Sequence, residues 1–231
     1  MVRVLADIFT FDNTRYLFSG LFNTLLIAVM TVLVSIVFGT VLALCRNYHK
    51  GILGKIASVY TEVFRNTPLL LWILVCVFLV HFGRSMTRGA LALILYTSSV
   101  IAEIIRGGLN SIHFGQFEAA RSQGFNFFQT LVYIVLPQCF RRVIPSLLSQ
   151  VITTVKDTSF LAQFAIAEFF YNSKNLMSSL PQKITLTTTH IFVIFGFIAL
   201  MYFIINFSLS CLVRRLASPS QKLHIHDISG D

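Results

Sequence analysis

The sequence predicts an all-α integral membrane protein with about five transmembrane helices. Of 231 residues, 55% are hydrophobic and only 12% are charged, against about 45–50% and about 25% in soluble domains. The apolar residues gather in runs long enough for helical spans, which need about 20 residues each. The chain has a net charge of +9, and most of its Lys and Arg residues lie between those runs. This pattern argues against a disordered chain and against a soluble nucleic-acid binder, whose basic residues would form a patch.

Five segments are apolar enough to cross a bilayer. They cover residues 21–44, 52–82, 90–105, 143–170 and 184–213. The first is too long for a secretory signal, and Asp7 and Asp12 precede it. The second contains Pro68, which predicts a kink or break near Thr67 because proline lacks an N–H and disfavours helix at the residue before it.

The basic residues set the direction of the spans. Those on the side of Cys45 are more numerous and lie closer to the ends of the spans, so this side should be cytoplasmic. Arg84 and Arg88 lie on the opposite side and argue the other way. The expected organisation is an external N-terminal segment (1–20), a transmembrane permease domain (21–215) with a cytoplasmic loop at about 106–142, and a cytoplasmic tail (216–231).

The cytoplasmic loop contains two recognisable helices. Residues 116–123 read as a helix that ends at Gly124, a residue suited to a left-handed C-terminal cap. Asn126 precedes Gln129 by three residues, as in a capping box, and the helix it begins should end before Pro137. A short helix with an exposed Ala pair suits insertion into a groove of another protein.

The loop carries the most specific motif in the chain. Glu118-Ala119-Ala120-x-x-x-Gly124, then nine residues, then Ile134-x-Leu136-Pro137, resembles the EAA motif of ABC importer permeases. The strings at 64–70, 102–108 and 156–159 resemble the branch of that family that carries polar amino acids. The resemblance extends from about residue 23 to residue 215. The alternative for the loop is an ordinary helical hairpin that caps the bundle.

The resemblance implies a type I importer architecture in the bacterial cytoplasmic membrane, N-terminus outside and C-terminus inside. Two permease subunits, identical or homologous, would form the pore with two cytoplasmic ATP-binding subunits, and an extracytoplasmic binding protein would deliver the amino acid. The residues implied to contact the ATPase are Glu118, Ala119, Ala120, Arg121 and Gly124. No cofactor is expected on this chain, because ATP and Mg would bind the partner ATPase. The segment 51–55 lacks the spacing of a phosphate-binding loop, so the chain is not expected to be an enzyme.

Charged residues inside the spans are candidates for the substrate site, because each needs a partner or a water-filled cavity. Asp157 offers an anion for the ammonium group of an amino acid. Lys156, Thr158 and Ser159 offer donors for its carboxylate. The alternative is that Lys156 and Asp157 form structural pairs between subunits.

The break near Pro68 gives further candidates. Interrupted helices expose N–H groups that suit a carboxylate, and Arg65 could bind one bidentately. Asn66 and Thr67, at the break itself, are candidates for the substrate site together with Arg65. Alternatively, Glu62 neutralises Arg65, while Asn66 and Thr67 cap the next helix. Glu103 is a fourth candidate, although Arg106, three residues on, can pair with it.

No metal site is expected. His224 and His226 suit a solvated tail, and the four widely spaced cysteines suit small apolar residues. The rival functions are an ABC permease for another small polar solute and, less favoured, an ion-coupled secondary transporter, which would usually show paired repeats. The identity of the amino acid and the choice between a homodimer and a heterodimer stay open.

Overall fold

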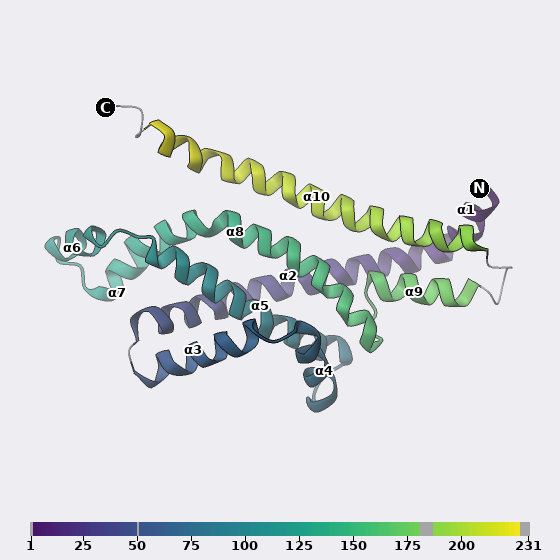
Figure 1. Cartoon of the computed structure of the whole chain (residues 1–231), viewed down its shortest axis with the longest axis horizontal. Coiled ribbons are helices and arrows are strands. Elements are labelled where there is room, and N and C mark those ends of the chain that lie inside the picture. Colours follow the sequence, from purple (N-terminus) through teal and green to yellow (C-terminus); the bar gives the residue numbers. More distant parts are fainter. Residues whose placement is uncertain (1, 50, 181–186, 227–231) are drawn as a thin grey trace. The chain divides into compact units, whose positions relative to one another are not determined.

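A computed structural model describes residues 2–49, 51–180 and 187–226, and side chains from residue 4 to residue 215 within those ranges. Within them every regular element is helical (Figure 1). The α-helices are α1 (Val2–Ile8), α2 (Phe11–Tyr48), α3 (Ile52–Arg65), α4 (Leu69–Leu79), α5 (Ser85–Asn110), α6 (Gly115–Ser122), α7 (Phe127–Thr130), α8 (Leu136–Asp157), α9 (Phe169–Ser179) and α10 (Thr188–His226). A π-helical turn covers Leu131–Val135, and a 3₁₀ helix covers Thr158–Phe164.

Among the described residues, four helical segments are long and apolar enough to cross a membrane. They are Phe11–Tyr48, Ser85–Asn110, Phe127–Phe164 and Thr188–Arg215. A fifth span is possible if α3 and α4 are counted together, although the two are bent by 105°. The predicted break near Thr67 is confirmed, because α3 ends at Arg65 and α4 begins at Leu69.

The chain divides into two compact units. Each of the helices α2, α5, α8 and α10 contributes residues to both of them. The first unit comprises residues 1–32, 69–94 and 151–209. Its core is apolar and includes Ile8, Leu17, Phe169, Leu176, Leu180, Ile194 and Ile198. The start of α2 packs closely on α9 at Gly20, where a Cβ would lie 2.7 Å from Asn172 Nδ2 and 2.9 Å from the carbonyl oxygen of Glu168. Glycine at this position therefore permits the close approach of the two segments.

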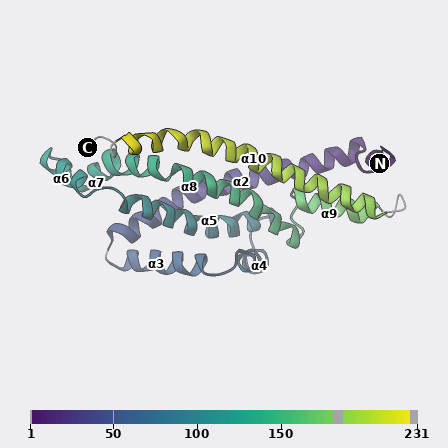
Figure 2. The ribbon, with the colours of Figure 1, turned by 45° about the horizontal axis from the view of Figure 1, so that its top comes forward.

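The second unit comprises residues 33–68, 95–150 and 210–231. Here α5 and α8 run side by side, and α6 and α7 lie at the end of this pair (Figures 1 and 2). The buried core of this unit draws on α2, α5, the π-helical turn and α8, and it includes Ala43, Ile101, Ile105, Leu109, Leu131, Val135, Cys139 and Val143. Gly108 sits at the contact, where an added Cβ would meet Val143 Cγ1 at 2.3 Å and Cys139 Sγ at 2.8 Å.

The prediction that a helix ends before Pro137 is wrong. The chain stays helical from Phe127 to Asp157, because the π-helical turn widens the backbone just before the proline. The N–H of Leu136 donates to the carbonyl oxygen of Leu131, five residues back. The side chain of Gln138 donates to the carbonyl oxygen of Ile134 at 3.0 Å. The helix therefore continues through Pro137, and the connection between α5 and the next helix is only residues 111–126.

The far end of this long helix also differs from the span predicted at 143–170. After Asp157 the backbone tightens into the 3₁₀ helix, which ends at Ala165 in a left-handed conformation with φ of 53°. Glu168 then caps a separate helix, α9. Polar contacts of the Glu168 side chain, rather than apolar periodicity, set this boundary.

Candidate functional site

Residues 111–126, which connect α5 to α7, form an ordered projection, called here the connecting loop. Its helix α6 ends in a Schellman motif: the N–H of Phe125 donates to the carbonyl oxygen of Ala120 at 3.0 Å, and that of Gly124 donates to Arg121 at 2.9 Å. Gly124 has φ of 80°, which confirms the predicted left-handed cap. Such a cap satisfies carbonyl groups at the helix end and fixes the direction of the chain that follows.

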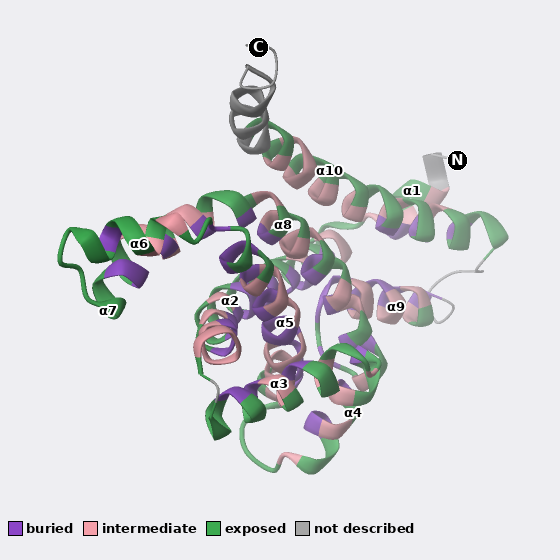
Figure 3. Ribbon diagram, turned by 60° about the vertical axis from the view of Figure 1, so that its left-hand side comes forward, coloured by how far each residue is buried: buried purple, intermediate pink, exposed green. Residues whose placement is uncertain are grey.

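The predicted capping box at the start of α7 is also confirmed. The N–H of Gln129 donates to Asn126 Oδ1 at 2.8 Å, and the N–H of Asn126 donates to Gln129 Oε1 at 2.9 Å. Both ends of the turn between α6 and α7 are therefore held by specific hydrogen bonds. The turn presents a defined surface although most of its residues are exposed (Figure 3).

Aromatic packing fixes the loop to the long helices of its unit. The ring of Tyr48, at the end of α2, lies 5.3 Å from that of Phe127 and 6.3 Å from that of Phe117. On the other side, the Gln138 side chain donates to Gln116 Oε1 at 3.0 Å. A movement of α6 would therefore be transmitted to α2 and α8 through direct contacts.

The expectation of an exposed Ala pair is only half right. Ala120 is 3% exposed and helps to pack α6 down, whereas Ala119 is exposed. Glu118 and Arg121 are exposed with it, and in the described part of the chain no hydrogen bond or ion pair of either side chain is seen. Ala120 thus lies on the buried side of α6, whereas the side chains of Glu118, Ala119 and Arg121 are exposed on the surface of the loop.

A charged cluster lies where α2, α3 and α5 of the second unit meet. Glu103 accepts from Arg106, at 2.5 Å to Oε1, and from Arg46, at 2.9 Å to Oε2. Arg65 lies 3.3 Å from the same carboxylate. Glu62 completes the cluster through a contact of 3.0 Å with Arg46. The predicted pairing of Glu103 with Arg106 is confirmed, and the cluster as a whole carries one excess positive charge.

The idea that Glu62 neutralises Arg65 is wrong, because Arg65 contacts Glu103 and Glu62 contacts Arg46. The bonds seen for the side chains of Asn66 and Thr67 run back to α3. Asn66 Nδ2 donates to Glu62 Oε2 at 3.2 Å, and Thr67 Oγ1 donates to the carbonyl oxygen of Val63 at 2.7 Å. The Thr67 bond satisfies a carbonyl group in the last turn of α3, where such acceptors lack partners within the helix.

The four candidates at 156–159 lie in the first unit, where α8 gives way to the 3₁₀ helix. Asp157 is partly buried and Lys156 is exposed, and no ion pair joins them within the described residues. The hydroxyl of Thr158 donates to the carbonyl oxygen of Val155 at 2.8 Å, and that of Ser159 donates to Lys156 at 2.7 Å. These two hydroxyl hydrogens are engaged by the backbone, which leaves the ammonium group and the carboxylate as the groups available to a ligand.

Glu168, a carboxylate with no exposed surface, is not among the candidates predicted from the sequence. It accepts hydrogen bonds from the N–H groups of Phe170 and Tyr171, at 2.9 and 2.6 Å, and from the hydroxyls of Thr24 and Tyr202, at 3.2 and 3.3 Å. It follows the candidate span that ends at residue 164. Burial raises the pKa of its carboxyl group, and the two N–H donors oppose that effect. The feature of the sequence that could have indicated it is its position directly before three aromatic residues, with which α9 begins.

No cluster of three metal-binding side chains occurs among the described residues. The side chains of His224 and His226 lie outside the described part of the chain. All four cysteines are unpaired thiols, two of them buried.

Comparisons with known proteins agree on one family. Residues 35–219 match the model of the binding-protein-dependent transport system inner membrane component. The probable glutamine ABC transporter permease protein GlnP of Bacillus subtilis (strain 168) is 36% identical over 89% of this chain and 94% of its own length. The glutamate/aspartate import permease protein GltK of Escherichia coli O157:H7 is 34% identical over 87% and 92%. A crystal structure of an amino acid ABC transporter with histidines superposes with a TM-score of 0.75 at 27% identity, covering 87% of this chain and 92% of that one.

Proposed function

The chain belongs to the family of binding-protein-dependent transport system inner membrane components, and we propose that it is the permease subunit of an ABC importer for a polar amino acid. The single observation that carries the proposal is its extended similarity to glutamine and glutamate/aspartate permeases, over nearly nine-tenths of the chain. Its helical architecture supports a type I importer permease in the cytoplasmic membrane. It contributes the path across the bilayer, and the energy comes from a partner.

In this proposal the connecting loop links the permease to two cytoplasmic ATP-binding subunits. Glu118, Ala119 and Arg121 present exposed side chains to the partner, whereas Ala120 and Gly124 hold α6 in place through packing and its left-handed cap. Closure of the ATPase dimer around ATP and Mg displaces α6. The contacts of Tyr48 and Gln138 carry that displacement to the spans. A second permease subunit completes the pore, and an extracytoplasmic binding protein supplies the amino acid.

For the substrate site, the contacts favour Asp157 and Lys156 over the other candidates. An amino acid presents one ammonium and one carboxylate group, and these two side chains offer the complementary charges. Thr158 and Ser159 shape the site through the backbone. The charged candidates near the break between α3 and α4 already have partners, because Arg65 and Glu103 pair with each other. We assign them, with Asn66 and Thr67, to holding the bend between α3 and α4.

The test is uptake into liposomes that contain this permease, its companion permease and its ATPase, with binding protein supplied outside. Labelled polar amino acids are screened for ATP-dependent accumulation. Glu118→Lys is expected to abolish uptake while leaving binding-protein docking intact, because it reverses a charge on the surface presented to the ATPase. Lys55→Glu reverses a charge at an exposed position of α3, outside the connecting loop, and is the matched control, expected to transport normally.

The same assay tests the substrate site. Asp157→Asn is expected to raise the KM for the amino acid by about tenfold or more, since a hydrogen bond to a charged group contributes about 1.5–3 kcal/mol. Ser159→Ala is expected to change it less than about twofold, because its hydroxyl already bonds within the helix. Uptake driven by an ion gradient without ATP would refute the importer function and favour a secondary transporter.

A further inference from the structure

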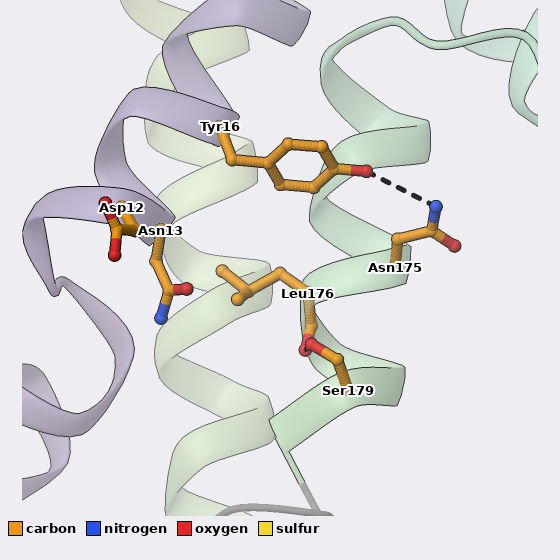
Figure 4. Close-up of a pocket in the computed structure, with 6 residues that line it drawn as sticks. All are labelled: Asp12, Asn13, Tyr16, Asn175, Leu176 and Ser179. Carbon is orange, nitrogen blue, oxygen red and sulfur yellow. Dashed lines mark hydrogen bonds between the residues drawn. The ribbon is translucent and has the colours of Figure 1, made fainter.

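A polar hollow of about 460 Å³ opens between the start of α2 and α9 in the first unit (Figure 4). Two helices contribute to it: Asp12, Asn13 and Tyr16 come from α2, and Asn175, Leu176 and Ser179 come from α9. Tyr16 extends across the gap, and its hydroxyl oxygen accepts from Asn175 Nδ2 at 3.3 Å. No part of the coupling or substrate sites described above lies in this hollow.

The polar groups of the hollow include several oxygen atoms that can accept hydrogen bonds, and they carry one negative charge. Asn13 donates one Nδ2 hydrogen to the carbonyl oxygen of Ile8 at 2.9 Å, and Asn175 donates one to the Tyr16 hydroxyl, so each side chain keeps its carboxamide oxygen and a second N–H. The Ser179 hydroxyl donates to the carbonyl oxygen of Leu176 at 2.9 Å, so the lone pairs of the Ser179 oxygen remain able to accept a hydrogen bond. Asp12 is exposed, and the described residues supply no partner for its carboxylate.

The chemistry that complements this set is a cation with several N–H donors. A lysine ammonium group is such a cation, since it has three donors and no acceptor. An anion or a carboxylate would be repelled by Asp12, the one charged residue that lines the hollow. The hollow is open to the surface, so a side chain from another protein can reach it without any rearrangement of the helices.

The proposed topology gives the side of the membrane. Residues 12–16 precede the core of the first span, and residues 175–179 fall between the last two spans. Both segments are external when the N-terminus is outside. We propose that this hollow, formed by Asp12, Asn13 and Asn175 with their neighbours, receives a lysine side chain of the extracytoplasmic binding protein. The inference rests on the proposed function, and it adds a docking position and the charge of the partner group.

The test uses the complete transporter in nanodiscs, with ATP hydrolysis measured against the concentration of amino-acid-loaded binding protein. Asp12→Asn is expected to raise the concentration of binding protein that gives half-maximal stimulation by about fivefold, and Asp12→Lys by more, because loss of a charge at an interface slows association. The maximal rate and the basal rate without binding protein should stay unchanged. The effect of Asp12→Asn should shrink at high salt, since exposed charges are screened.

Asp7→Asn is the matched control: it removes one negative charge from the same N-terminal segment but does not line the hollow. A second readout is zero-length crosslinking with a carbodiimide, which joins a carboxylate to an amine in contact with it. Asp12 should be joined to a lysine of the binding protein, as identified by peptide mass spectrometry.

Three results would overturn the inference. In the first two, Asp12→Asn and Asp7→Asn behave alike, or no crosslink to Asp12 forms although the binding protein stimulates the wild type. In either of these cases the proposed function stands. In the third, the binding protein does not stimulate the wild type at all, and both the proposed function and the inference fail.

Discussion

At the scale of single residues, Glu168 shows how a buried charge organises one end of the first unit. Its two oxygens accept four hydrogen bonds, from two backbone N–H groups and two hydroxyls. Thr24 in turn accepts from the N–H of Phe169 at 3.1 Å. Such a network stabilises when every member is satisfied, and it is costly when one acceptor is removed.

Glu168→Ala should therefore destabilise the protein strongly. It leaves buried donors without an acceptor, and we expect a loss of about 3 kcal/mol in the free energy of unfolding. Glu168→Gln keeps one acceptor oxygen and should cost about 1 kcal/mol. The thermal unfolding midpoint of the purified permease checks both. Glu118→Ala, at an exposed glutamate, serves as the control. Equal midpoints for Glu168→Ala and Glu118→Ala would contradict this account.

At the scale of helices, the contact between α5 and α8 depends on a small residue at one position. Gly107 and Gly108 are neighbours on α5, but only Gly108 faces the partner helix: a Cβ at Gly107 would have nothing within 4 Å. The sequence shows two adjacent glycines and gives no means of telling them apart. The direction in which the two helices cross decides which of them packs.

Gly108→Ala is expected to destabilise the protein by about 1–3 kcal/mol, because the new methyl group overlaps Val143 and Cys139. Gly107→Ala adds the same methyl group in open space. It should be neutral or stabilise by about 0.5–1 kcal/mol, as alanine favours the helix. Chemical or thermal unfolding of the two variants side by side gives the comparison. A similar loss for both would show that helix propensity, and not the helix contact, is responsible.

At the scale of the whole molecule, the charge pattern predicts a topology that the helices by themselves do not reveal. A helix crosses a bilayer equally well in either direction, and basic residues retained in the cytoplasm break that symmetry. The proposed arrangement places the N-terminus outside and the C-terminus inside. It also places the connecting loop on the side where ATP is available, and the hollow at Asp12 on the side of the binding protein.

Cysteine labelling tests this topology directly. In a variant whose four native cysteines are replaced by alanine, Thr10→Cys should react with a membrane-impermeant maleimide added to intact spheroplasts, whereas Ser218→Cys should react only after the membrane is permeabilised. Uptake by both variants is measured to show that they assemble. The reverse labelling pattern would invert the topology and remove the basis for the docking hollow.

Much of the local structure followed from sequence because its causes are local. Long apolar runs determined that the chain crosses the bilayer, Pro68 determined a break, and the Gly124 cap and the Asn126 capping box depend on residues within one or two turns. Similarity to a family at fixed spacing indicated the function. These features need no knowledge of which helix packs on which.

The tertiary structure decided everything that depends on contacts between distant residues. It assigned Arg65 to Glu103 rather than to Glu62, buried Ala120, and let the helix continue through Pro137 by means of a π-helical turn. It also brought Thr24 and Tyr202 to Glu168. A charged side chain takes whichever partners the folded helices place within reach, and spacing along one helix cannot determine partners that arrive from another.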